Sequence, residues 1–154
     1  AWSLLTALSD LSSSDKKNIE QYQNIIEGPN WLDKRNEDRL YKNREPEVIV
    51  IGGGQAGLSI AARLKQQNID TLIVDKNERI GDNWRNRYHS LKLHNQTHVN
   101  HLPYMPFPST WPTYIPKDKL AGWFEYYVES MELNAWTNTK FIGAEYYEIK
   151  STGK

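Results

Sequence analysis

The stretch "VIVIGGGQAGLSIAARL", Val48–Leu64, decides the fold of this chain. Its first four residues, Val48–Ile51, are branched and apolar, which is typical of a parallel strand that is covered on both faces. Three glycines follow at once, although glycine loses more conformational freedom on folding than any other residue. A glycine cluster after a buried strand therefore needs a physical reason, and close approach of the backbone to a phosphate group supplies one.

The residues after the glycines predict the rest of a βαβ unit. Residues 58–67 form an expected helix in which Ala61 and Ala62 are small enough to lie close to a sheet. Thr71–Val74, which follows the turn "QNID", is the expected second buried strand. Strand, helix and strand together have the size of a βαβ unit. We therefore predict an α/β fold with a Rossmann-like unit and a parallel sheet.

Gly52, Gly54 and Gly57 match the G-x-G-x-x-G pattern of dinucleotide-binding turns. The pattern alone is weak, but here it lies between a strand and a helix, and Asp75 ends the next strand 18 residues after Gly57. Gly52 would permit the tight turn, Gly54 the approach of a pyrophosphate, and Gly57 close packing of helix and strand. The free N–H groups at the helix start would meet the phosphate charge, and Asp75 would accept hydrogen bonds from ribose.

This spacing predicts a dinucleotide site without choosing between NAD and FAD. A glycine turn that binds no ligand is the structural alternative.

The regions on either side of this unit differ in composition. Residues 1–45 are polar and charged, and we expect an N-terminal arm or linker with short helices over residues 2–8 and 30–42. The domain itself would occupy residues 46–154, where the chain stops after an expected strand.

Residues 76–116 are rich in Pro, Asn, His and aromatic side chains, and they predict long ordered loops of the kind that carry function. Apolar residues at helical spacing then predict an amphipathic helix over residues 116–131. The stretch "FIGAEYYEIK", residues 141–150, predicts a strand, and "STGK" a hairpin turn with no return strand.

Composition excludes several classes of function. The formal net charge is zero, so bulk electrostatics does not drive binding to nucleic acid or to an anionic membrane. The absence of cysteine excludes disulfides, thiol nucleophiles and thiolate metal sites. No apolar run approaches the roughly 20 residues of a membrane helix, and the start of the chain lacks the basic leader of a signal peptide. We therefore expect a cytoplasmic protein with no nucleic-acid partner and no membrane span.

Beyond Asp75 the sequence resembles the flavin-containing monooxygenases, including YUCCA-type and Baeyer–Villiger-like relatives. The resemblance covers about residues 46–150 and rests on blocks in the family's order: "VIVIGGGQAGLSIAARL", "IVDKNERIGDNWR", "RYHSLKLH", "LPYMPFPSTWPTYIPKDKLAGWFEYY" and "NAWTNTKFIGAEY". It implies that the glycine motif binds FAD. For a full-length enzyme it implies NADPH-dependent oxygenation of a small molecule with a reactive nitrogen, sulfur or carbonyl group, by chemistry that belongs to the flavin.

The resemblance also assigns roles at the FAD site, residue by residue. Asp75 matches the ribose-binding acid, which is more often Glu in the family, and Lys76 matches a position beside the adenosine. The shorter Asp side chain would bring the sugar closer or require a bridging water. The residues that match the pyrophosphate turn and its helix are Gly52, Gly53, Gly54, Gln55, Ala56 and Gly57.

Two further pairs match the flavin end of the cofactor. Asn83 and Trp84 match the loop beside the ribityl chain and pyrophosphate, and His94 and Asn95 match a polar pair near the isoalloxazine ring. Gly81 and Asp82 stand where the family usually has two glycines, so this loop departs from the family's pattern.

Several alternatives remain open from the sequence. Residues 76–154 contain no second glycine motif, so we expect NADPH to bind outside this chain. For the same reason, a binding-only or degenerate flavoprotein is an alternative. The sequence assigns no catalytic residue. A single-Rossmann NAD-dependent dehydrogenase is another, although no Tyr-x-x-x-Lys pair is evident. His94, His98 and His101 have a spacing that a metal could use on a helix, but the stretch lacks a helical pattern and a carboxylate. We expect no metal site.

The ends of the chain predict an incomplete domain. The first residue is not Met, and the expected final turn lacks a partner strand. We expect this chain to be the front of a longer protein or a truncated gene product. Its sheet would then lack strands, and the apolar faces left uncovered would favour self-association. The sequence does not identify the substrate.

Overall fold

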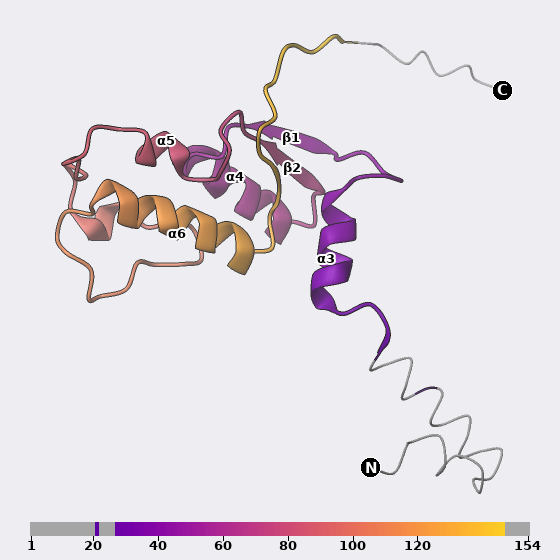
Figure 1. Cartoon of the computed structure of the whole chain (residues 1–154), viewed down its shortest axis with the longest axis horizontal. Coiled ribbons are helices and arrows are strands. Elements are labelled where there is room, and N and C mark those ends of the chain that lie inside the picture. Colours follow the sequence, from indigo (N-terminus) through magenta and orange to yellow (C-terminus); the bar gives the residue numbers. More distant parts are fainter. Residues whose placement is uncertain (1–20, 22–26, 147–154) are drawn as a thin grey trace, which may run out of the picture. The chain divides into compact units, whose positions relative to one another are not determined.

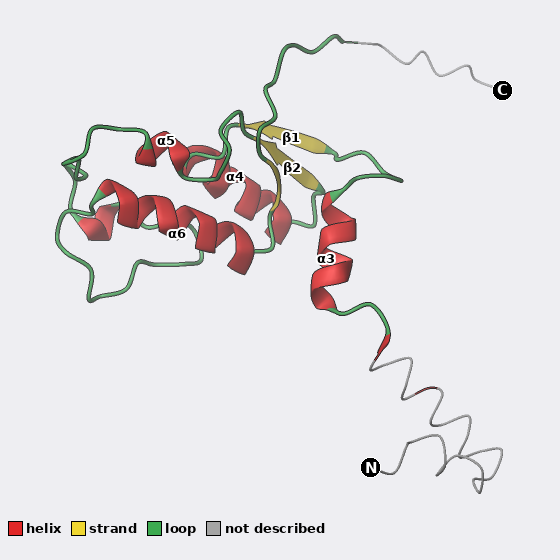
Figure 2. Ribbon diagram, viewed as in Figure 1, coloured by secondary structure: helices red, strands yellow, loops and turns green. Residues whose placement is uncertain are grey.

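The computed structural model describes residue 21 and residues 27–146. The chain divides into two units, residues 1–38 and residues 39–154. Figures 1 and 2 show the elements along the chain. They are α3 (Trp31–Arg39), β1 (Val48–Ile51), α4 (Gln55–Gln66), β2 (Thr71–Val74), α5 (Asp82–Arg85), the 3-10 turn η1 (Thr97–Val99), α6 (Lys117–Ser130) and β3 (Asn134–Trp136).

Helix α3 is the described element of the N-terminal region, where we expected a helix over residues 30–42. Its start is capped reciprocally, because the Asp33 N–H donates to Asn30 Oδ1 at 3.0 Å and the Asn30 N–H donates to Asp33 Oδ2 at 2.9 Å. The helix ends at Arg39, and Tyr41 adopts a left-handed φ of 50°. The expected helix over residues 2–8 lies outside the described residues.

Within the described residues, three parallel strands form one open sheet in the order β1-β2-β3. Val48 pairs with Thr71 at one end of the first ladder, and Leu72 pairs with Asn134 in the second. The predicted α/β fold with a parallel sheet is therefore confirmed. Strand β2 lies in the middle, and all four of its residues are buried.

The third strand is not where the sequence placed it. The prediction of a strand from residue 141 is wrong for residues 141–146, which form no strand, while residues 147–154 lie outside the described part. Strand β3, Asn134–Trp136, is instead defined by its pairing with β2 and by the hydrogen bond from the Asp75 N–H to the Trp136 oxygen at 2.9 Å. Three residues with a polar first member carry too little pattern to predict a strand.

The two long helices supply most of the core. Helix α4 begins at Gln55, three residues earlier than predicted, because the glycine turn leads directly into it, and Leu58, Ala61 and Ala62 are buried as it packs on β1 and β2. Helix α6 follows the prediction closely. Its apolar stripe, which includes Phe124 and Tyr127, joins the same core cluster.

The segment between β2 and α6 is mostly irregular, as predicted, and Figure 2 shows it as loops broken by short helical turns. Hydrogen bonds between its two halves hold it in place. The Leu93 N–H donates to the Ile115 oxygen at 2.9 Å, and Lys92 forms an antiparallel bridge with Pro116.

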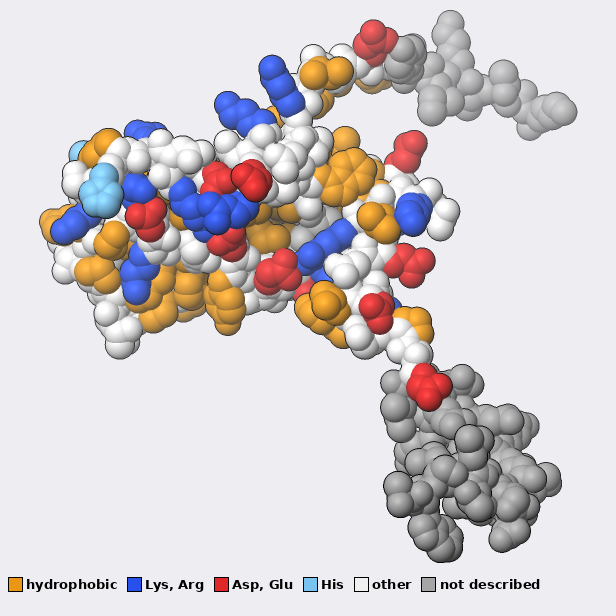
Figure 3. Space-filling model, in the orientation of Figure 1, with side chains coloured by type: hydrophobic (Ala, Val, Ile, Leu, Met, Phe, Trp, Pro, Cys, Tyr) orange, Lys and Arg blue, Asp and Glu red, His pale blue; other side chains and the backbone are white. Residues whose placement is uncertain are grey.

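One face of β1 is open in the described chain. Ile49 and Ile51 are 53% and 60% exposed, so the expectation that this strand is covered on both faces is wrong. The reason is that alternate side chains of a strand point to opposite faces, and Ile49 and Ile51 lie on the face that α4 does not cover. Figure 3 shows acidic and basic side chains interspersed on the face in view. No helix among the described residues is long and apolar enough to cross a membrane.

Glycine at position 81 is required by its backbone, which gives a first prediction. Gly81 has a φ of 89°, and an added Cβ would lie 2.5 Å from the Ala121 oxygen of α6. We expect Gly81→Ala to lower the free energy of unfolding by more than about 2 kcal/mol, from strain and displaced backbone. Gly122→Ala is the matched control in α6, because its Cβ meets no atom within 4 Å. It should raise stability by up to about 1 kcal/mol. Urea unfolding of both variants tests the pair, and equal effects would contradict it.

Tyr127 gives a second prediction, on pH. Its side chain is fully buried and its hydroxyl donates to the Pro103 oxygen at 2.9 Å. Burial, with a smaller contribution from Tyr104, raises the pKa of Tyr127 to about 12. A raised pKa in the fold means that stability is present below pH 10 and is lost as pH rises toward 12, by about 2 kcal/mol. Unfolding measured from pH 9 to 12 should show this slope. It should be shallower in Tyr127→Phe and unchanged in Tyr146→Phe, whose ring is 90% exposed.

Candidate functional site

The glycine turn joins the end of β1 to the start of α4. Gly52 has a left-handed φ of 98°, and its N–H donates to the Val74 oxygen at 2.8 Å, which extends the β1–β2 ladder into the turn. Gly54 is the N-cap residue of α4 in an extended conformation, and no side chain of the described residues caps the helix there. The first N–H groups of α4 are therefore available to an anion at the carboxyl edge of the sheet.

Each glycine of the turn meets a different constraint. An added Cβ at Gly57 would overlap the Gly52 carbonyl oxygen, and one at Gly53 would lie 2.5 Å from Ile80 Cδ1. Gly57 is therefore required by the neighbouring backbone, whereas the contact at Gly53 is with the end of a side chain that can shift. At Gly54 the nearest atom would be Asn83 Nδ2 at 3.4 Å, so the protein itself leaves room there. That room faces the pocket described below, which Gly54 lines.

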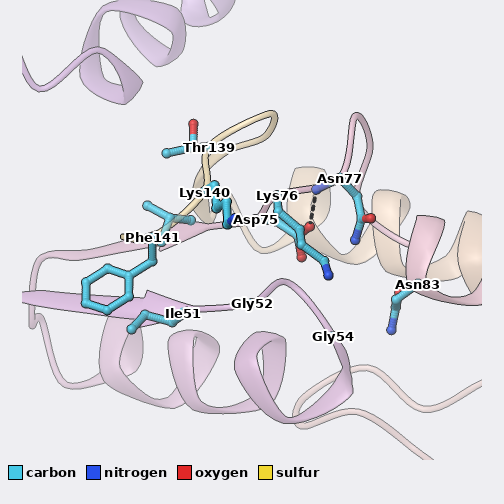
Figure 4. A pocket seen from close by; sticks show the side chains of 11 residues that line it. Ile51, Gly52, Gly54, Asp75, Lys76, Asn77, Asn83, Thr139, Lys140 and Phe141 are labelled. Atoms are coloured by element: carbon cyan, nitrogen blue, oxygen red, sulfur yellow. Dashed lines mark hydrogen bonds between the residues drawn. The ribbon is translucent and has the colours of Figure 1, made fainter. Parts of the chain in front are cut away.

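The Asp75 carboxylate holds this turn. Its side chain is buried, with 7% exposed. Oδ2 accepts the Gly53 N–H at 2.6 Å and Oδ1 accepts the Asn77 N–H at 2.8 Å, the second of which is dashed in Figure 4. One carboxylate thus ties the end of β2 to the turn after β1. Its oxygens keep further lone pairs for a ligand hydroxyl.

A pocket of about 450 Å³ opens at this edge of the sheet. Figure 4 shows Phe141 and Ile51 at one end of it and Asn83 at the other, beyond Gly54. Among its walls are two lysines, Lys76 and Lys140, which place positive charge beside the carboxylate. The lining residues are Ile51, Gly52, Gly54, Val74, Asp75, Lys76, Asn77, Asn83, Thr139, Lys140 and Phe141.

Some of these residues were not found from the sequence. Asn77 lies two residues after Asp75, and Thr139, Lys140 and Phe141 follow β3. The ends of parallel strands meet at one edge of a sheet, so the position of β3 would have placed residues 139–141 at the site. Because the sequence pattern did not predict β3, it did not place residues 139–141 at the site.

The remaining predicted residues lie away from the pocket walls. Gln55 is in the first turn of α4, where its Nε2 donates to the Asn100 oxygen at 3.3 Å, and Ala56 is exposed beside it. Trp84 is partly buried and packs against the hydrophobic core. His94 and Asn95 are exposed on the long loop and do not line this pocket. A role for this pair near a flavin ring stays a prediction.

Of the three histidines in the pattern, His98 and His101 line one pocket in the long loops and His94 does not. His101 Nδ1 accepts the Phe107 N–H at 2.9 Å and its ring lies 5.3 Å from the Phe107 ring, measured between centroids. No group of three or more His, Cys, Asp or Glu within residues 27–146 could hold a metal ion.

A charged network fixes α5, the short helix that carries Asn83. The Arg85 guanidinium donates to Asp82 Oδ1 at 2.9 Å and to the Ile80 oxygen at 2.8 Å, and it also pairs with Glu125 of α6. The buried Lys117 ammonium donates to the Arg85 oxygen at 2.9 Å. This network explains why the chain has Asp82 where the family usually has a glycine: the Asp82 carboxylate accepts the hydrogen bond from Arg85, and a glycine has no side chain to do so.

The ionisation of Asp82 follows from the same contacts. Burial alone would raise the pKa of Asp82, but the hydrogen bond from Arg85 and the nearby Arg79 hold this pKa below its usual value. The ionised carboxylate therefore also accepts the Arg79 N–H, at 3.1 Å, and closes the turn before α5.

Comparisons with known proteins agree with this geometry. Residues 50–109 match a family model described as an NAD(P)-binding Rossmann-like domain. An uncharacterized CzcO-like oxidoreductase of Geobacillus kaustophilus is 43% identical over 102 residues, which cover 64% of this chain and 28% of that protein. The probable indole-3-pyruvate monooxygenase YUCCA3 of Arabidopsis thaliana is 30% identical over 141 residues, covering 88% of this chain and 31% of that protein.

A solved structure shares both fold and sequence. A flavin monooxygenase from Stenotrophomonas maltophilia superposes with a TM-score of 0.55 at 27% identity, over 59% of this chain and 28% of that one. The chain spans less than a third of the length of these relatives.

The fold, the glycine turn and these matches define a Rossmann-type oxidoreductase domain that binds a flavin or a nicotinamide nucleotide. More particularly, the chain is related to the flavin monooxygenases.

The different constraints on Gly54 and Gly57 give a third prediction. Gly54→Val places its side chain in the pocket, and we expect dinucleotide binding to fall by more than 10-fold, or about 1.4 kcal/mol, with little change in the melting temperature of the unliganded protein. Gly57→Ala should lower that melting temperature, because its Cβ displaces the Gly52 carbonyl. Calorimetric titration and thermal unfolding separate the two effects. Unaffected binding in Gly54→Val would place the ligand elsewhere.

Proposed function

We propose that this chain is the FAD-binding segment of a flavin-dependent monooxygenase. The observation that carries the proposal is the pocket at the glycine turn, with Asp75 at its floor. Backbone N–H groups at the start of α4 would bind the pyrophosphate, and Asp75 would accept a hydrogen bond from the ribose. Lys76 and Lys140 would add favourable charge near the phosphates and the adenosine.

The chemistry of the residues at this pocket supports such a ligand. The uncapped start of α4 offers donors for an anion, and Gly54 leaves the space that a phosphate would take. Phe141 and Ile51 offer an apolar wall for the adenine ring. When bound, FAD would supply the redox chemistry, and this chain's part is to hold the adenosine and pyrophosphate in a fixed position.

Sequence relationship favours FAD over a nicotinamide nucleotide at this pocket. The relatives include a probable indole-3-pyruvate monooxygenase and a flavin monooxygenase. The family model that matches residues 50–109 is described by NAD(P) binding, so a nicotinamide nucleotide in the same pocket is the second candidate.

The activity of the whole protein belongs to the same proposal. We propose that it oxygenates a small molecule bearing a reactive nitrogen, sulfur or carbonyl group, in the cytoplasm, with NADPH bound by residues beyond this chain. Residues 76–154 contain no second glycine motif that could bind NADPH. This chain alone would then bind flavin without turnover.

A binding comparison tests the proposal and is the fourth prediction. We expect the protein to bind FAD at least 10-fold more tightly than NAD⁺ or NADP⁺ in calorimetric titrations. Lys140→Met should weaken FAD binding several-fold without changing thermal stability, because Lys140 is exposed and lines the pocket. Lys92→Met, an exposed lysine outside the pocket, is the matched control. Tighter binding of NADP⁺ than of FAD would favour the second candidate instead.

A further inference from the structure

A second pocket lies in the long loops and has no part in the proposed function. Its volume is about 460 Å³, within the range of small-molecule sites. It shares no lining residue with the pocket at the glycine turn. Its walls are made by Gln96, Thr97, His98, His101, Phe107, Pro108, Ser109, Trp111 and Thr113.

Stacked aromatic rings form one wall of this loop pocket. Phe107 is buried, with 5% exposed, and its ring stacks on Trp111 with centroids 4.9 Å apart and planes at 20°. Trp123 of α6 packs edge-on against Trp111 at 5.2 Å between centroids. The aromatic wall is therefore held from behind by the helix. The Phe107 ring is covered by His101, Trp111 and Trp123, and the partly exposed Trp111 is the ring of this wall that a ligand can contact.

Hydrogen bonds between the two loops hold the pocket open without a ligand. The Thr97 N–H donates to the Thr113 oxygen at 2.8 Å, and the Thr97 hydroxyl donates to the Pro112 oxygen at 2.5 Å. The Phe107 N–H donates to His101 Nδ1 at 2.9 Å. A preformed pocket spends less free energy on ordering when a ligand binds.

The polar groups of the pocket favour a ligand that accepts hydrogen bonds. Because His101 Nδ1 accepts the Phe107 N–H, the neutral imidazole carries its proton on Nε2, which is then a donor. His98 and Ser109 add further polar groups, and no Asp or Glu lines the pocket. The Lys119 ammonium lies 4.7 Å from the centroid of the Trp111 ring and adds positive charge beside the wall.

We propose that the loop pocket binds a small aromatic carboxylate. The ring of the ligand packs against Trp111, and its carboxylate accepts a hydrogen bond from His101 Nε2. Lys119 favours the negative charge. The proposal does not depend on FAD binding at the glycine turn.

Benzoate is the probe for this site, with binding followed by NMR on the indole N–H signal of Trp111, assigned from a Trp111→Phe variant. We expect a saturable shift of this signal. His101→Asn should weaken benzoate binding at least fivefold, because asparagine can still accept the Phe107 N–H but lacks the Nε2 donor. Trp111→Leu, followed by the shifts of the Phe107 amide, should abolish binding. His89→Asn, an exposed histidine that lines neither pocket, should bind as the wild type does.

Two further experiments test whether the aromatic ring of the ligand is recognised and which of the two pockets binds it. Cyclohexanecarboxylate has the same acid without an aromatic ring, and we expect it to bind at least fivefold more weakly than benzoate. Gly54→Val should leave benzoate binding unchanged. Absence of a saturable shift up to about 10 mM, the weak limit for such a fragment, would overturn the proposal. So would undiminished binding in His101→Asn, or loss of binding in Gly54→Val, which would place benzoate in the dinucleotide pocket.

Discussion

The buried carboxylate of Asp75 is the contact on which the site depends. It accepts the Gly53 N–H and the Asn77 N–H and so links the turn after β1 to the residues after β2. With the carboxylate in place, the turn can hold the left-handed Gly52 and bring the start of α4 to the sheet edge. The Asp75 side chain fixes the backbone itself, and it lines the pocket with lone pairs that remain available to a ligand.

The sheet and helices then follow from burial around this edge. Strand β2 is central and wholly buried, α4 and α6 cover one side of it with a shared core, and β1 leaves Ile49 and Ile51 exposed on the other. The polar network of Asp82, Arg85 and Glu125 ties α5 to α6 and holds Asn83 near Gly54. The pocket is therefore bounded by elements whose positions are set by packing and by partly buried ion pairs.

Local patterns were enough to predict part of this structure. The apolar runs of β1 and β2, the glycine turn and the stripe of α6 each carry their own signal, and all four were placed correctly. Strand β3 was missed because Asn134–Trp136 is short and is defined only by its pairing with β2. Lys140 and Phe141 were missed with it. The loop pocket was missed because hydrogen bonds between distant residues, such as Thr97 and Thr113, create it.

Hydrogen–deuterium exchange with and without FAD tests the central claim most directly, because it reports on the backbone groups of the turn. The account predicts that saturating FAD slows exchange at the amides of residues 52–57 and at Asn77, while amides of the exposed residues 142–146 exchange as before. Protection confined to other residues, with the turn unchanged, would contradict a dinucleotide site at the Asp75-held glycine turn.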